Sequence, residues 1–217
     1  MGKGYAMNTK TKSITLGFTN KRFQPGVHIC FIYRDEQERQ KVIAKFLKSG
    51  YENHEKIGYF TDIMTVDELI KWVNEIGIDL SASSDNKQFV IKQAVDHYCP
   101  DGCFIPQNSL NAMGQYYDDA KKEGFSGARV TGETSWQAKF KKIQGIDQFI
   151  IYETLLNKLL KKHPVTTMCQ YDAKLFSGAE IFDILQVHPY MIVHGQVVEN
   201  PAYLRPDEFL KVVQSRK

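Results

Sequence analysis

The sequence lacks the glycine-rich motifs that mark common enzyme folds. A P-loop requires Gly-x-x-x-x-Gly-Lys-Ser/Thr, but the only Gly-Lys pair here is Gly2-Lys3. There is no Gly-x-Gly-x-x-Gly fingerprint and no Gly-x-Ser-x-Gly nucleophile motif. These absences argue against a conventional P-loop NTPase, a classical dinucleotide-binding enzyme and an α/β-hydrolase.

Charge of one sign, long apolar runs and cysteines are also scarce. The 28 basic and 25 acidic residues leave a net charge of +3, and they are interspersed, so no nucleic-acid partner is predicted. No apolar run is long enough for a signal peptide or a membrane span. The four cysteines are Cys30, Cys99, Cys103 and Cys169. With no membrane contact expected, we predict a reduced, cytoplasmic protein.

Strand-like and helix-like stretches alternate between residues 27 and 188. The expected strands cover residues 26–33, 56–62, 88–95, 126–131 and 165–171. Such alternation predicts an α/β fold, a three-layer sandwich with a mostly parallel central sheet. An antiparallel hairpin near residues 190–198 should lie at one edge. Without repeats or linkers, we expect an N-terminal arm or tail (1–22) and a single α/β domain (23–217).

Capping residues and glycines predict where the helices begin and end. Three capping boxes are expected, at Asp35 with Glu38, Thr65 with Glu68, and Ser177 with Glu180. Gly50, Gly77 and Gly124 follow helical patterns and are predicted to end them. Further helices are expected at 109–123, at 137–143, after Asp147 and after Pro206.

Several predicted strands end in polar or aromatic residues, as in the stretch Ala128–Trp136. Ligands bind beyond the carboxyl ends of the strands in open α/β sheets, and aromatic walls with a few polar groups suit a small molecule. The predicted ligand-binding residues at these ends are Tyr33, Asp62, Tyr98, Glu133, Trp136, Gln170, Tyr171 and Asp172. The alternative for Glu133 and Trp136 is an acid in a first helical turn and a core indole. No nucleophile–base pair is present among them, so no catalytic residue is predicted.

A metal site was considered at His97-x-Cys99-x-x-x-Cys103. Structural zinc needs four ligands, and the second ligand pair is missing, so we predict neither a metal ligand nor a cofactor. The sequence leaves open whether His28, Cys169 and His188 approach one another. If they do, a metal or haem site becomes worth testing.

Five elements together resemble one family. They are His28-x-x-x-x-Tyr33, Gly58-Tyr59-x-x-Asp62, Arg129–Trp136, Cys169-Gln-Tyr-Asp172 and His188-Pro189. Over about residues 25–212 the chain resembles the MEDS domain, the sensory domain of dichloromethane-repressor proteins. The resemblance implies a RecA/KaiC-like fold that has lost its phosphate-binding loop, and a sensor of one-carbon or simple hydrocarbon derivatives. His28 and His188 thereby join the predicted ligand-binding residues.

The resemblance also bears on partners and on rival functions. Family members often carry a helix-turn-helix or a kinase module, whereas this chain is expected to be a stand-alone sensor with a signalling or transcriptional partner protein. A partner-binding or scaffolding domain is the second hypothesis, with a homodimer left open. A RecA-like nucleotide-binding enzyme, with Glu133 activating water, is the third. Asp62 and Glu133 could equally form a buried, hydrogen-bonded pair that fixes the sheet ends.

Overall fold

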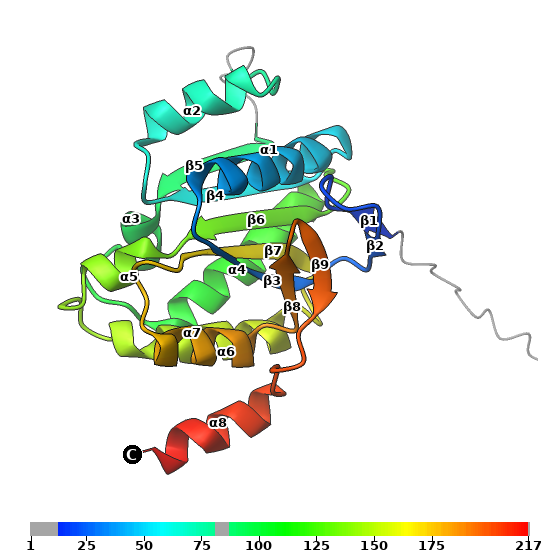
Figure 1. Cartoon of the computed structure of the whole chain (residues 1–217). Coiled ribbons are helices and arrows are strands. Elements are labelled where there is room, and N and C mark those ends of the chain that lie inside the picture. The colour runs from blue at the N-terminus through cyan, green and yellow to red at the C-terminus, as the bar shows by residue number, and fades with distance from the viewer. Residues whose placement is uncertain (1–12, 81–86, 217) are drawn as a thin grey trace, which may run out of the picture.

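The fold is a seven-stranded sheet between two layers of helices (Figure 1). The computed structural model describes residues 13–80 and 87–216. The sheet has the order β5-β4-β6-β7-β3-β8-β9, and all neighbours are parallel except β8 and β9. Its strands are β3 (His28–Tyr33), β4 (Lys56–Thr61), β5 (Phe89–Gln93), β6 (Ala128–Glu133), β7 (Val165–Asp172), β8 (Tyr190–Val193) and β9 (Gln196–Glu199). The predicted α/β sandwich with its antiparallel edge hairpin is confirmed.

The helices divide between the two faces of the sheet. They are α1 (Glu36–Glu52), α2 (Val66–Glu75), α3 (Ala94–Tyr98), α4 (Pro106–Lys122), α5 (Ser135–Lys139), the 3₁₀ turn η1 (Ile146–Gln148), α6 (Phe149–Leu159), α7 (Gly178–Val187) and α8 (Pro206–Ser215). Helices α1 and α2 cover one face, and α4, α6 and α7 cover the other, with α8 packed outside α6 and α7 (Figure 1).

The side chains of each strand point alternately to the two faces of the sheet, so each face has its own hydrophobic core. On the α1 face, Ile29 and Phe31 of β3 pack with Phe46 of α1. On the opposite face, Val130 of β6 packs with Leu156 of α6. Because successive strand side chains point to opposite faces, each central strand contributes to both layers.

Three helices begin at the predicted N-cap residues. Both halves of the capping box are present at Thr65 and at Ser177, whereas Asp35 accepts a hydrogen bond from the backbone N–H of Glu38 without the reciprocal bond. The prediction that Gly50 ends a helix is wrong, because α1 continues to Glu52. Gly50 instead lies where the Arg129 side chain crosses the helix.

Three other predicted boundaries also differ from the structure. The expected helix at 137–143 is only α5, because Gln144 bridges to Cys103 and its carbonyl accepts from the N–H of Phe104, which draws the chain into a turn. The strand expected at 88–95 gives way to α3 after Gln93, and the helix expected from residue 109 begins at Pro106. Proline is favoured in a first helical turn because its missing N–H would have no partner there.

The N-terminal segment forms a small sheet of its own. Strands β1 (Ile14–Thr15) and β2 (Arg22–Phe23) pair in antiparallel fashion, and Leu16 between them is fully buried in the core of the α1 face. The described part of the predicted arm is therefore packed against the domain, and β2 crosses the expected boundary at residue 22. Residues 1–12 lie outside the described residues.

Candidate functional site

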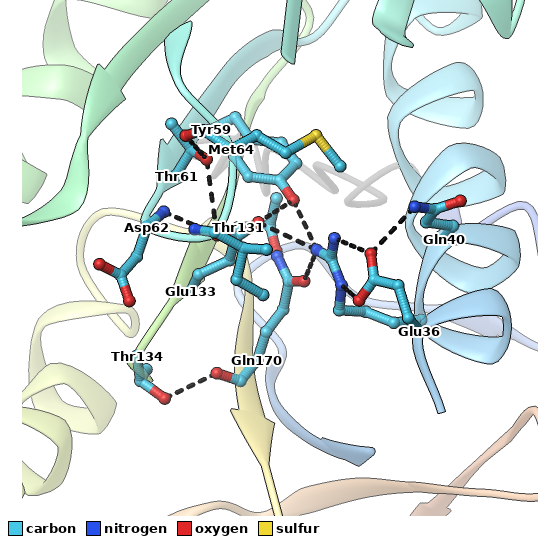
Figure 2. Close-up of polar contacts among 12 residues, drawn as sticks. Glu36, Gln40, Tyr59, Thr61, Asp62, Met64, Thr131, Glu133, Thr134 and Gln170 are labelled. Carbon is cyan, nitrogen blue, oxygen red and sulfur yellow. Dashed lines mark hydrogen bonds and ion pairs between the residues drawn. The ribbon is translucent and has the colours of Figure 1, made fainter. Parts of the chain in front are cut away.

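A buried ion network fills the carboxyl edge of the sheet on the α1 face. The Arg39 guanidinium donates through one nitrogen to Glu133, Tyr59 and Gln170, each at 2.9 Å. Its other nitrogens bond both carboxylate oxygens of Glu36, at 2.6 and 2.7 Å. These partners are shown in Figure 2. Arg39 and Glu133 are at most 1% exposed, so the centre of this network is buried, while its Glu36 partner is exposed.

Glu133 is also the anchor of the loop that follows β4. Its second carboxylate oxygen accepts from the backbone N–H groups of Asp62 and Ile63, each at 2.6 Å (Figure 2). The carboxylate of Asp62 instead pairs with Lys139 at 3.1 Å. Glu133 therefore fixes the end of the sheet, as one alternative held, but through backbone donors and not through a pair of carboxyl groups.

Two carboxylates lie at the N-terminus of α1. Asp35 caps the helix and Glu36 follows it in the first turn. Burial opposes ionisation of Arg39, but Glu36, Tyr59 and Glu133 together raise the pKa of its guanidinium. The cation at this helix terminus is already neutralised by the protein.

Two predicted residues lie beside this network without joining it. The ring of Tyr33 lies 5.7 Å from the Arg39 guanidinium, and its buried hydroxyl has no hydrogen-bond partner among residues 13–80 and 87–216. Burial raises the pKa of that hydroxyl. Asp172 accepts from the backbone N–H of Lys174 and so shapes the turn after β7.

Tyr98 and Trp136 belong to the hydrophobic core. Their rings are stacked at 5.3 Å between centroids, and Trp136 packs edge-on against Phe149 at 5.4 Å. Trp136 is fully buried. The core-indole alternative therefore describes its surroundings, although its indole nitrogen has no partner in the described part of the chain.

The remaining predicted residues meet on the opposite face of the sheet. We call the following group the His–Glu–Cys cluster: His28 of β3, Glu153 of α6, Cys169 of β7 and His188 at the end of α7. Their ligand atoms all lie within 4.8 Å of one another, and each residue is at most 8% exposed. His28 Nε2 and His188 Nε2 lie 3.0 and 3.5 Å from one Glu153 oxygen. The open question about His28, Cys169 and His188 is thereby answered, because they do approach one another.

Burial and mutual contacts set the ionisation of this cluster. Burial, with the nearby charge of His188, lowers the pKa of His28. Burial would raise the pKa of Glu153, but its contacts with His188 and His28 hold it well below its usual range. Burial and the charge of Glu153 raise the pKa of the Cys169 thiol. Tyr171 completes the surroundings by donating to the other Glu153 oxygen at 3.2 Å.

This cluster is the one place where described residues could hold a metal ion through three or more His, Cys, Asp or Glu side chains. Among residues 13–80 and 87–216, the side chains of His97, Cys99 and Cys103 do not form such a metal-binding group. The His97 ring instead stacks on Phe60, with 3.6 Å between the ring centroids.

An open cleft lies at the carboxyl edge of the sheet on the α6–α7 face. It has a volume of about 300 Å³ and is bordered by α5, η1, α6, α7 and the loop before α7. Its apolar lining consists of Ala138, Ile146, Phe149, Ile150, Phe176 and Ile184, and its polar rim of Gln137, Lys141, Asp147, Glu180 and Asp183. None of the predicted binding residues lines it. Trp136 and Tyr171 lie directly behind the lining, against Phe149 and Phe176.

The structure thus separates seven of the predicted site residues into three groups, while Tyr33, Asp62 and Asp172 lie beside the first of these. Glu133 and Gln170 belong to the network on the α1 face, Tyr98 and Trp136 to the aromatic core, and His28, Tyr171 and His188 to the opposite face. The sequence analysis missed Arg39 and Glu153. Each is a charged residue within the apolar stripe of its helix, which is the signal that could have found them: Arg39 precedes Val42 and Ile43, and Glu153 lies between Phe149 and Leu156.

Comparison with known proteins gives a family match. The MEDS family (MEthanogen/methylotroph, DcmR Sensory domain) matches residues 27–189. No curated protein matches the chain in sequence. No helix in the described ranges is both long and apolar enough to cross a membrane.

Solved structures show the same fold at low sequence identity. The KaiC-like protein PH0186 of Pyrococcus horikoshii OT3 superposes with a TM-score of 0.60 at 15% identity, covering 83% of this chain and 80% of that one. The uncharacterized protein PH0321 of Pyrococcus horikoshii, solved with an unknown peptide, gives 0.59 at 11% identity, covering 86% and 91%. The flagellar accessory protein FlaH of Methanocaldococcus jannaschii gives 0.54 at 9% identity, covering 80% and 76%. The chain belongs to the MEDS family of sensory domains and has a RecA/KaiC-like fold.

Proposed function

We propose that this MEDS domain senses a small organic molecule, a one-carbon or simple hydrocarbon derivative, that binds in the cleft between α5 and α7. The observation that carries the proposal is the cleft itself, with its apolar lining and polar rim. Ligand sites are concave and mostly apolar, with a few polar groups that orient the ligand, and volumes run from about 300 to 1,000 Å³. A cleft at the lower limit of that range suits a small ligand.

The location follows from what occupies the other face. Ligands of open α/β sheets bind beyond the carboxyl ends of the strands. On the α1 face that position is filled by Arg39 and its carboxylate partners. The cleft is at the same edge on the other face, since α5 follows β6 and Phe176 follows β7.

We propose further that the domain is not an enzyme. A water-activating carboxylate must be free to accept a proton from water. The Glu133 oxygens are already engaged by Arg39, Tyr59 and two backbone N–H groups. The sensor would pass its signal to a partner protein in the cytoplasm.

Thermal unfolding with a panel of small compounds tests the proposal. Methanol, methylamine, dichloromethane and short alcohols form the panel, with ATP as the test of the enzyme alternative. A ligand at a hundred times its dissociation constant adds about 2.7 kcal/mol, which raises the melting temperature of a chain of this size by about 5–10 °C. A rise with ATP and with no panel compound would contradict the proposal.

A matched pair of variants locates the binding site. Ala138 lines the cleft and is only partly exposed, so Ala138→Trp should fill the cleft and abolish the ligand-induced rise. Ala112 is an exposed alanine of α4 that does not line this cleft, so Ala112→Trp should keep the rise. An undiminished rise in Ala138→Trp, with folding retained, would place the ligand elsewhere.

A further inference from the structure

The His–Glu–Cys cluster combines four side chains with the chemistry of a metal site. Two imidazoles, one carboxylate and one thiol are brought together from four separate elements, β3, α6, β7 and α7. Burying such groups is costly unless they are paired or coordinate a metal. Three features of the cluster, its spacing, the orientation of its rings and its charge, decide between those two explanations.

Of four distances between the ligand atoms, three match the edges of a tetrahedron around a zinc ion, and one is shorter. Zinc bonds are about 2.0–2.1 Å to nitrogen, about 2.0–2.2 Å to oxygen and about 2.3 Å to sulfur, so tetrahedral ligand atoms lie about 3.3–3.6 Å apart. Cys169 Sγ lies 3.5 Å from His28 Nε2 and 3.6 Å from Glu153 Oε2. Glu153 Oε2 lies 3.5 Å from His188 Nε2 and 3.0 Å from His28 Nε2.

Both imidazole rings turn Nε2 to the centre of the cluster and Nδ1 to an oxygen acceptor outside it. His188 Nδ1 lies 2.7 Å from the carbonyl of Ile184, which can only accept, so Nδ1 carries the proton. The Asn157 amide nitrogen donates to the carbonyl of Val187 at 2.7 Å. This orientation turns the amide oxygen of Asn157 to His28 Nδ1, at 3.1 Å. A hydrogen bond to the second ring nitrogen is the usual way in which proteins orient a metal-binding histidine.

When both rings are neutral, this arrangement leaves both Nε2 atoms bare and pointing at a Glu153 oxygen that is itself an acceptor. A proton on either Nε2 would instead form an ion pair with Glu153. The Nε2 atom of His188 is buried and makes no hydrogen bond of good geometry with any residue in 13–80 or 87–216. A cation at the centre would satisfy all of these atoms together.

The charges of the ligands select a dication. A thiolate and a carboxylate carry two negative charges, which a divalent ion neutralises, and the two imidazoles add none. Thiolate, imidazole and carboxylate groups are each ligands of Zn²⁺, and four protein ligands leave no open position, as in structural zinc sites. We propose that the His–Glu–Cys cluster binds a single Zn²⁺ ion that ties α6 and α7 to the sheet.

Metal content and Co²⁺ spectroscopy of the full chain test the proposal. The purified wild-type protein should contain one zinc per chain. After removal of zinc by a chelator, Co²⁺ should bind with equal stoichiometry and produce intense visible bands of tetrahedral cobalt and a sulfur-to-cobalt charge-transfer band. A folded wild-type chain that takes up neither ion would overturn the proposal, and the cluster would then be a proton-bridged network.

Two cysteine variants identify the sulfur ligand. Cys30 is the control for Cys169, because the two residues are paired on neighbouring strands and both are buried, but Cys30 is not in the cluster. Cys169→Ser should abolish the charge-transfer band, and Cys30→Ser should keep it. A band that survives Cys169→Ser contradicts the assignment.

X-ray absorption of the zinc-loaded wild type keeps the test decisive if Cys169→Ser does not fold. The expected first shell is one sulfur at about 2.3 Å and three nitrogen or oxygen atoms at about 2.0–2.2 Å. A shell without sulfur would overturn the proposal.

Discussion

Gly50 shows how one missing side chain lets a buried cation cross a helix. Arg129 of β6 passes over α1 to reach Glu55, the carbonyl of Phe46 and the carbonyl of Thr15. A Cβ atom at Gly50 would lie 2.8 Å from Arg129 Cδ and Nε, which is closer than real side chains approach. This glycine is therefore required for close packing and not for the end of the helix.

We predict that Gly50→Ala destabilises the domain although alanine is the better helix former. Overpacking of this kind typically costs about 1–3 kcal/mol, measured as the free energy of unfolding in urea. Gly114 in α4 is the matched control, because its nearest neighbours would lie 3.7 Å or more from a new Cβ. Gly114→Ala should be neutral or stabilise by about 0.5–1 kcal/mol. Equal effects at the two positions would contradict this explanation.

The lowered pKa of His97 predicts that the protein loses stability at acid pH. Burial, with the nearby charge of Lys92, lowers the pKa of His97 from 6.5 to about 4. Between these two values the unfolded chain binds a proton that the folded protein does not. The free energy of unfolding is therefore unaffected by protonation of His97 above pH 6.5. It falls as the pH drops toward 4, by roughly 3 kcal/mol in total from this residue.

The variant His97→Phe isolates this contribution. Phenylalanine can keep the stacking on Phe60 but binds no proton. Its free energy of unfolding should therefore fall less than that of the wild type between pH 6.5 and pH 4. Parallel curves for the two proteins would show that His97 does not account for the slope.

Helix α7 depends on its capping box, and it borders both the cleft and the His–Glu–Cys cluster. Ser177 accepts from the N–H of Glu180, whose carboxylate accepts from the N–H of Ser177 at 2.7 Å. We expect Ser177→Ala to cost about 1 kcal/mol of unfolding free energy, or about 2–4 °C in melting temperature. Ser215→Ala, at an exposed hydroxyl in the last turn of α8, should change the stability by no more than about 0.5 kcal/mol. If Ser177→Ala changed the free energy of unfolding as little as Ser215→Ala does, the capping box would not stabilise α7.

The sequence predicts those elements whose signals are local. The capping boxes at Thr65 and Ser177, and the buried strands, depend on neighbouring residues and are found correctly. Gly50 is misjudged because the reason for it, Arg129, lies on β6, far from α1 in the sequence. The end of the helix at α5 is misjudged in the same way, since its cause is the pairing of Gln144 with Cys103.

The candidate sites depend on contacts that sequence cannot order. Glu133 and Gln170 lie together beside Arg39, but the sequence does not show to which face of the sheet each predicted binding residue points. Period-two alternation separates Gln170 from Cys169 and Tyr171, and so divides one motif between two sites. Arg39 and Glu153 lie in helices, so a search of the strand ends does not find them.

The two faces of the sheet have different roles across the domain. The α1 face carries the Arg39 network at the carboxyl edge of the sheet. The α6–α7 face carries the cleft and, below it, the His–Glu–Cys cluster. Phe176 of the cleft packs on Tyr171, which donates to Glu153. A contact path of two residues therefore links the proposed ligand to the proposed metal ion.

Isoleucine methyl NMR during a ligand titration can show whether a ligand binds in the cleft between α5 and α7. The titrant is the panel compound that gives the largest rise in melting temperature. Binding in the cleft should produce saturable shifts for Ile146, Ile150 and Ile184, which line it, while Ile29 and Ile57 in the core of the α1 face stay unchanged. Shifts centred on Ile29 and Ile57, or no shift of any isoleucine methyl with any panel compound, would show that the cleft is not the ligand site.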